Sequence, residues 1–332
     1  MTLTSTTAGS TSAPTTVTLL PPNPATVAPP LNHSVATDPA TATAFLYAGP
    51  SPVQIGVAPS TIDPVRVAVL RGKVLDASGA PRSGVTITIL NHPEFGLTLS
   101  RADGMFDMAV NGGGPLTVSY TKTGLLPAQR TLNPSWQSYL VAPDVILLPL
   151  DPQVTAITLG ASTMQAARGS AMTDADGTRQ ATVLFPAGTT ATMVMPDNST
   201  QPLTTLHVHA TEYTVGPNGP KAVPAQLPPN SGYTYAVEFS AEEEIAAGAK
   251  TILFSQPVMV YLENFLGFPA GTVVPLGSYD RGQGAWLPEN SGRVDQDHRG
   301  QRRPRHRGHR RVDLIGAAYA QRCRAAAARL AL

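Results

Sequence analysis

The stretch VAVLRGKVLDASGAPRSGVTITI, residues 67–89, decides the fold. Its first segment, Val67–Leu75, ends at Asp76–Pro81, a cluster of turn-forming residues, and Val85–Ile89 then alternates β-branched apolar residues with threonine. Because successive side chains of a strand point to opposite faces, strict alternation is typical of a strand with one buried face. The stretch therefore predicts short strands joined by tight turns.

The same pattern continues to residue 150. Asp103-Gly104 supplies a turn, and further strands are expected over Met105–Val110 and Leu116–Tyr120, with a last apolar run over Asp144–Leu150. Several strands at a spacing of roughly ten residues favour a small antiparallel sandwich. We therefore predict a first β-sandwich domain over residues 65–150.

A second β domain is expected over residues 151–290. One short helix, Ala241–Ala249, is expected in it, with Ser240 as N-cap and three glutamates, residues 242–244, in the first turn, where the helix dipole favours them. Its strands are expected at Gln180–Phe185, Thr190–Met195, Leu203–Val215, Thr234–Phe239, Thr251–Phe254 and Val258–Tyr261.

Composition agrees with an all-β protein. Only 14% of the 332 residues are charged. The chain includes 29 Gly and 32 Pro, and because both residues break helices, their number disfavours a helical bundle. No apolar run is long enough to cross a bilayer, so no transmembrane segment is expected. The single cysteine, Cys323, excludes an internal disulfide.

The two ends of the chain differ from the middle. Residues 1–64 are rich in Thr, Ser, Pro and Ala and are expected to form a disordered leader and linker, with no signal peptide visible. Residues 293–332 carry 11 Arg and 3 Asp, a net charge of +8 against −7 for the residues before them. The tail, residues 291–332, is expected to be disordered or partly helical. Because its residues have G/C-rich codons, we hypothesise that it is read out of frame.

Two short motifs resemble metal sites. His207 and His209 lie on one face of an expected strand and could chelate a metal, but no third ligand is near. We expect them on a solvated face, opposite an apolar one. Asp174–Gly177 resembles a calcium loop but lacks the further oxygen ligands, so we interpret it as a turn.

No catalytic, cofactor-binding or metal residue is predicted, and no cofactor. The segment His92–Glu94 lacks the ligand arrangement of a metalloprotease, and Asp144, Asp151 and Glu263 are expected to be isolated, solvated acids. Cys323 lies in the unusual tail and is not expected to be a nucleophile. A basic run without interleaved aromatics predicts no specific nucleic-acid binding.

Residues 72–87, GKVLDASGAPRSGVTI, resemble the carboxypeptidase regulatory-like (transthyretin-like) domain family. Ser100–Phe106 is similar to the family's second signature, a hairpin of the form T/S-x-x-D-G-x-F. Leu116–Tyr120 with Thr123–Leu125 is similar to the third, although Leu125 departs from it. The resemblance covers about residues 65–150 and implies a β-sandwich without a catalytic zinc.

The longer stretch Ala44–Pro288 resembles the N-terminal region of bacterial RHS/YD-repeat (teneurin-like) proteins. Asn91–Gly96, Arg101–Gly114 and Ala210–Pro220 carry this resemblance. In such proteins these β domains precede a large shell of Tyr-Asp repeats, whereas this chain has the single pair Tyr279-Asp280. The resemblance implies a truncated fragment of a larger protein.

The expected function is that of a non-catalytic structural or interaction module of a cell-surface or secreted protein. Its expected partners are neighbouring domains of a larger RHS-like protein or another protein surface, with weak self-association. The alternative is a carbohydrate- or surface-binding adhesion module. Its candidate aromatic residues are Trp136, Tyr139, Tyr233 and Trp286.

Overall fold

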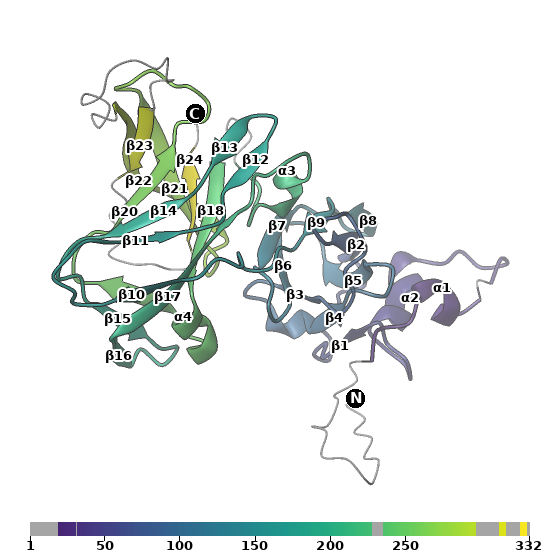
Figure 1. Cartoon of the computed structure of the whole chain (residues 1–332). Coiled ribbons are helices and arrows are strands. Elements are labelled where there is room, and N and C mark those ends of the chain that lie inside the picture. The colour runs from purple at the N-terminus through teal and green to yellow at the C-terminus, as the bar shows by residue number, and fades with distance from the viewer. Residues whose placement is uncertain (1–18, 31, 228–234, 297–311, 317–325, 331–332) are drawn as a thin grey trace, which may run out of the picture. The chain divides into compact units, whose positions relative to one another are not determined.

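The computed structural model describes residues 19–30, 32–227, 235–296, 312–316 and 326–330. The chain divides into two compact units, Met1–Leu147 and Leu148–Leu332, both built mainly of strands (Figure 1). The all-β fold predicted from the alternating pattern is therefore confirmed.

The first unit is a sandwich of two sheets. In one sheet β2 is central, paired antiparallel with β5 and parallel with β8 and β9. The other sheet has the order β1-β4-β3-β6-β7 and is antiparallel throughout. The bounds are β1 Gln54–Ile55, β2 Val67–Leu75, β3 Thr86–Ile89, β4 Leu97–Leu99, β5 Met105–Asn111, β6 Leu116–Thr121, β7 Ala128–Leu132, β8 Ser138–Val141 and β9 Val145–Ile146, with a 3₁₀ turn η2 at Pro93–Phe95.

The core of this unit explains the alternation in the sequence. Ile87 and Ile89 are buried between the sheets, whereas Thr86 and Thr88 are only half-buried. The ring of Phe106 meets that of Tyr120 edge-on, with centroids 5.6 Å apart, a favoured aromatic geometry.

The stretch before the sandwich is more ordered than its composition indicates. Residues 1–18 lie outside the described residues, but α1 (Pro24–Val27), α2 (Pro39–Thr43) and η1 (Ala44–Leu46) follow. Leu46 and Val53 are buried against Val69, on the face of β2 that points away from the sandwich core. The prediction of a disordered leader and linker is wrong for residues 39–55, because a few apolar side chains find a partner on an exposed sheet face.

Gln54 fixes this stretch to the sandwich. Its side chain is fully buried; Nε2 donates to the carbonyl oxygens of Phe95 and Ala109, and Oε1 accepts from the N–H of Ala109 at 2.7 Å. Since β5 is an edge strand, Gln54 replaces a neighbouring strand at that position. Residues 54 and 55 also pair with β4 as β1.

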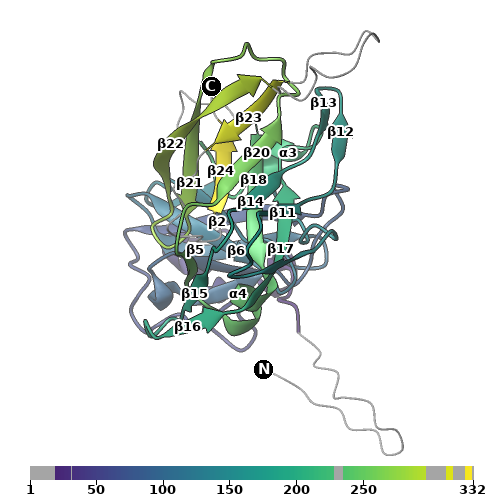
Figure 2. The same cartoon turned by 60° about the vertical axis from the view of Figure 1, so that its left-hand side comes forward.

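The second unit is built on a ten-stranded sheet of order β10-β17-β18-β24-β21-β22-β23-β20-β14-β11 (Figures 1 and 2). The first and last strands of this order, β10 and β11, contact each other. A Cβ added at Gly169, just after β11, would lie 2.2 Å from the carbonyl oxygen of Ala210 on β17, so glycine permits this close approach. The bounds are β10 Thr155–Thr158, β11 Gln165–Arg168, β14 Thr182–Phe185, β17 Thr205–Glu212, β18 Tyr235–Ala241, β20 Met259–Glu263, β21 Val273–Asp280, β22 Ala285–Gln296, β23 Val312–Gly316 and β24 Ala326–Leu330.

Smaller elements complete this unit. A three-stranded sheet has the order β16-β15-β19, and β12 pairs with β13 in a hairpin. Each strand predicted in this unit overlaps an observed one. The remaining bounds are β12 Met172–Asp174, β13 Gly177–Arg179, β15 Ala191–Val194, β16 Thr200–Leu203, β19 Thr251–Phe254 and α3 Gly219–Ala222.

The predicted helix exists, but its cap differs. Helix α4 spans Glu242–Ala247, and its N-cap is Ala241, which makes no side-chain cap bond. Ser240 belongs to β18 instead, so its prediction as N-cap is wrong. The strand runs directly into the helix, and two glutamates of its first turn, Glu242 and Glu243, bond to histidines of β17.

The tail enters the sheet where it is described. β22 continues to Gln296, across the boundary expected at residue 290. β23 lies between β22 and β20, and β24 between β18 and β21 (Figure 2). For residues 326–330 the expectation of a helix, based on alanine propensity, is wrong, because pairing with two neighbouring strands overrides it. Residues 297–311 and 317–325 lie outside the described residues.

Candidate functional site

Strand β8 presents an open edge of the first unit. It pairs with β2, and no described strand pairs with its other side. Leu140 packs against the core, whereas Tyr139 and Val141 are 60% and 75% exposed and Trp136 is 55% exposed. An unpaired strand edge offers free N–H and C=O groups to another chain. We call Trp136, Tyr139, Val141 and this strand edge the β8 edge.

Local geometry holds the β8 edge in place. Gln137 adopts a left-handed backbone conformation, with φ +50°, and its N–H donates to the carbonyl of Val67. The indole of Trp136 lies on Gly113, where a Cβ would come within 2.1 Å of the indole nitrogen. Residues 132–143 include no charged side chain. Natural edge strands are often protected by charges, so this edge lacks a common safeguard against pairing.

An ion triad around one buried carboxylate lies at the same sheet. Asp107 of β5 is fully buried and accepts from Arg71 Nε at 2.5 Å and from Arg101 Nη1 at 2.7 Å. Arg71 is its direct cross-strand neighbour on β2. Because a buried carboxylate needs such partners, the two arginines compensate the buried charge of Asp107.

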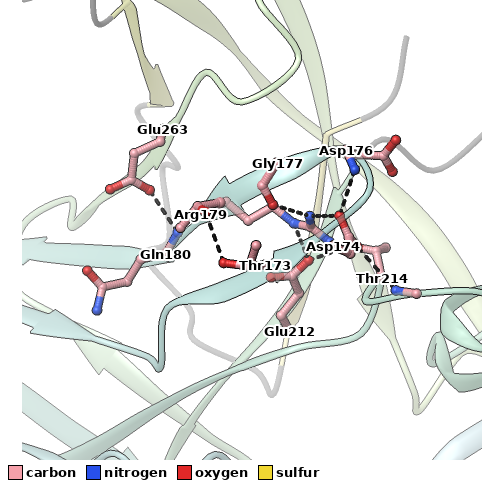
Figure 3. A network of polar contacts seen from close by, with 11 residues as sticks. Thr173, Asp174, Asp176, Gly177, Arg179, Gln180, Glu212, Thr214 and Glu263 are labelled. Atoms are coloured by element: carbon pink, nitrogen blue, oxygen red, sulfur yellow. Dashed lines mark hydrogen bonds and ion pairs between the residues drawn. The ribbon is translucent and has the colours of Figure 1, made fainter.

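A second buried network centres on Arg179 of β13 (Figure 3). Its side chain is 2% exposed and donates to both carboxylate oxygens of Asp174, at 2.6 and 2.7 Å. Its Nε donates to Glu212 Oε1 at 2.7 Å, and its guanidinium lies 4.6 Å from the ring centroid of Phe265. These bonds hold the β12–β13 hairpin against the end of β17.

The titration of this network follows from its contacts. The hydrogen bond from Arg179 holds the pKa of Asp174 far below its ordinary value. Burial raises the pKa of Glu212, and the bond from Arg179 opposes this only in part. Asp174 also accepts from the N–H of Asp176, so the interpretation of Asp174–Gly177 as a turn is confirmed. The chain supplies partners for Arg179, Asp174 and Glu212 Oε1, whereas Glu212 Oε2 is buried without a hydrogen bond from the described residues.

A third network joins β17, β18 and the end of β21. Arg281 donates from Nη1 and Nη2 to the two carboxylate oxygens of Glu238, each at 2.9 Å, and Tyr213 Oη donates to Glu238 at 3.0 Å. Glu238 is 1% exposed, so the paired guanidinium of Arg281 offsets the cost of burying this side chain.

The two histidines of β17 pair with the glutamates of α4. His207 Nδ1 lies 2.7 Å from Glu243 Oε1, and His209 Nε2 lies 3.2 Å from Glu242 Oε1. His209 is only 6% exposed, and its Nδ1 donates to the carbonyl of Asp151 at 2.7 Å. The prediction that both histidines are solvated is therefore wrong for His209, because α4 packs over this face of the strand.

The acids expected to be isolated are not alike. Asp151 is 8% exposed and accepts from the N–H and hydroxyl of Ser170, so its prediction as a solvated acid is wrong. Glu263 accepts from the N–H of Gln180 at 2.8 Å, and Asp144 is half-buried. His92 Nδ1 lies 2.8 Å from Glu94. Cys323 lies outside the described residues.

The candidate aromatic residues separate into two groups. Trp136 and Tyr139 are exposed together at the β8 edge. Trp286 packs on Tyr279, with ring centroids 5.1 Å apart, and donates to the carbonyl of Gln226. Tyr233 lies outside the described residues. Sequence reasoning did not single out Val141; the uncharged run over residues 132–143 is the signal that could have found it.

No three His, Cys, Asp or Glu side chains gather as a metal site within the described part of the chain. In that same part, no helix combines the length and apolar content needed to span a bilayer.

Comparisons with known proteins bear on the first unit. Residues 62–147 match the family described as the Teneurin TTR-like domain. Teneurin-3 of Danio rerio is 37% identical over 81 residues, and Teneurin-1 of Homo sapiens is 34% identical over 87 residues. These alignments cover 24% and 26% of this chain but 3% of each relative. The transthyretin-like resemblance is thereby confirmed for this segment in its teneurin form, and these matches do not single out bacterial RHS proteins.

Solved structures add less. A 3-chlorocatechol 1,2-dioxygenase from Rhodococcus opacus covers 28% of this chain and 64% of its own, at 12% identity and a TM-score of 0.23. A streptococcal ancillary pilin covers 42% of this chain and 59% of its own, at 8% identity and a TM-score of 0.22. Neither likeness is close enough to carry a functional argument.

Proposed function

We propose that this chain is a non-catalytic interaction module belonging to a larger cell-surface or secreted protein of the RHS/YD-repeat type. The β8 edge carries the proposal, because it combines an unpaired strand with exposed Trp136, Tyr139 and Val141. The teneurin TTR-like match of residues 62–147 supports a structural role for the unit that bears it.

The buried charges support this reading. Asp107, Arg179 and Glu238 are each satisfied by partners within the fold, and their arrangement stabilises the units rather than forming a reactive centre. The proposed partner is a neighbouring domain that adds a strand or an apolar surface to β8. Without that domain, the same edge is expected to give weak self-association.

Sedimentation velocity of the full chain tests the role of the β8 edge. The unaltered chain should associate as its concentration rises, and Val141→Lys should abolish the association by placing a charge on the edge. Met164→Lys is a matched control, since Met164 is 56% exposed in the other unit. A chain that stays monomeric throughout, or a Val141→Lys variant that associates equally, would contradict the proposal.

The parentage is tested separately by the nucleotide sequence that follows this reading frame. We expect a shifted frame to restore a β-like continuation and a Tyr-Asp repeat array. If no frame does so, the proposed relation to an RHS shell is wrong.

A second candidate, a carbohydrate-binding module, is favoured by the joint exposure of Trp136 and Tyr139. Exposed aromatic rings can stack on sugars. The same rings can also become buried in an interface with another protein. A glycan array probed with the full chain and with Trp136→Ala separates the two functions. Binding to defined glycans that Trp136→Ala removes would favour the carbohydrate-binding module.

A further inference from the structure

A pocket of about 530 Å³ lies within the second unit. It is bounded by β15, by the segment that follows α4, and by the end of β21. Its lining residues include Val194, Asn198, Glu244, Lys250, Leu253 and Arg281.

Glu244 is the unusual member of this lining. It is 8% exposed, its carboxylate borders the pocket, and among the described residues it is influenced by the charges of Glu238 and Arg281 without a hydrogen bond. Its neighbours on α4 behave differently, since Glu242 lies against His209 and Glu243 against His207. A buried carboxylate without a partner is costly, and native proteins seldom retain one without a reason.

The other charges around the pocket already have partners. Arg281 is bonded to both oxygens of Glu238, and Lys250 Nζ donates to Asn198 Oδ1 at 2.7 Å. Asp280 accepts from the N–H groups of Gly282 and Gln283. With Glu244 ionised, the three carboxylates Glu238, Glu244 and Asp280 exceed the two cations Arg281 and Lys250.

We propose that this pocket binds a primary alkylammonium group, with Glu244 as its counter-ion and with Val194, Ala249 and Leu253 against the alkyl stem. An ammonium ion would supply the hydrogen-bond donors and the positive charge that Glu244 lacks. The apolar lining fits a short methylene chain, as in a free alkylamine or a lysine side chain.

Burial raises the pKa of Glu244 to about 7. The negative charge of Glu238 adds to this increase, and the positive charge of Arg281 partly opposes it. Binding of a cation should therefore release a proton at neutral pH and weaken in acid. With a pKa of about 7, affinity should fall about tenfold between about pH 8 and about pH 6. The other titratable groups facing α4 are His207 and His209 on β17, Glu238 on β18, and Lys250, Asp280 and Arg281 around the pocket.

Titration calorimetry of the full chain with n-butylammonium tests the proposal, with n-butanol as the neutral probe. We expect saturable binding of n-butylammonium alone, weaker in acid, lost in Glu244→Gln and retained in Glu243→Gln. A parallel titration with Nα-acetyl-lysine amide shows whether the alkylammonium group that the pocket binds is that of a lysine side chain or that of a free amine. Equal binding of the alcohol, no binding of the amine, or full binding by Glu244→Gln overturns the proposal.

A second variant guards against a folding defect in Glu244→Gln. Ala249→Leu narrows the pocket while keeping Glu244, so it should weaken n-butylammonium binding at least tenfold. If Ala249→Leu binds the amine as tightly as the unaltered chain does, the pocket is not the site. These outcomes do not depend on the β8 edge, because neither variant alters the first unit.

Discussion

Replacing Glu244 by glutamine should stabilise the second unit, and more so as the pH rises. The carboxyl of Glu244 has an ordinary pKa of 4.5 that burial raises to about 7 in the folded chain. Between these values the folded state keeps a proton that the unfolded state releases. The unfolding free energy of the unaltered chain therefore falls as the pH rises through this window.

The size of the effect follows from the two pKa values. Between about pH 5 and about pH 8 the loss attributable to Glu244 amounts to about 2–3 kcal/mol. Glutamine has nearly the same shape and no charge to bury, so the variant should not show this loss. Its advantage over the unaltered chain should be small near pH 5 and largest near pH 8.

Urea denaturation followed by Trp286 fluorescence measures the effect in the right unit. A Trp136→Phe background removes the other tryptophan, which is largely exposed in the first unit. Glu243→Gln is the matched control. Burial raises the pKa of Glu243, but the hydrogen bonds from His207 outweigh burial, so the pKa lies below its ordinary value. Glu243→Gln should therefore gain no stability over the unaltered chain as the pH rises. An equal pH dependence in the unaltered chain and Glu244→Gln would refute the reasoning.

Four further predictions follow from the buried contacts. Arg179→Met should cost about 3–5 kcal/mol in urea denaturation, because it leaves buried carboxylates unpaired; a loss below about 1 kcal/mol would contradict this. Gln54→Ala should cost about 1–3 kcal/mol by freeing the backbone groups of β5, with faster hydrogen exchange at Ala109 as the specific sign. Gly104→Ala should destabilise the first unit in a calorimetric scan, since φ is +77° and a Cβ would lie 2.5 Å from the carbonyl oxygen of Val74. His207 Nδ1 donates a hydrogen bond to the Glu243 carboxylate, and this bond raises the pKa of His207. Its stabilising contribution is present in acid and fades as the pH rises, and Glu243→Gln should lower the pKa of His207 in an NMR titration.

The sequence predicts best where local pattern and tertiary burial coincide. Val85–Ile89 alternates because Ile87 and Ile89 enter one core, so periodicity alone reveals the strand. β8 escaped prediction because its outward residues are apolar, which erases the alternation of polar and apolar positions.

Long-range partners account for the other differences. Arg179 meets Glu212 across 33 residues of chain, and nothing in the spacing of either indicates the pair. His209 is buried because the carbonyl of Asp151 and helix α4 arrive from distant parts of the chain. The overall composition of residues 39–55 is that of a disordered segment. It does not reveal that two of its side chains, Leu46 and Val53, pack against the first unit.

The parallel pairing of β2 with β8 and β9 has a mechanical consequence. Tension applied before Val67 and after Ile146 would pull these strands along their length in opposite directions. The hydrogen bonds between them would then be loaded together in shear, rather than opened one after another from an end. The first unit should therefore resist pulling at these two points better than a unit whose hydrogen bonds open one at a time.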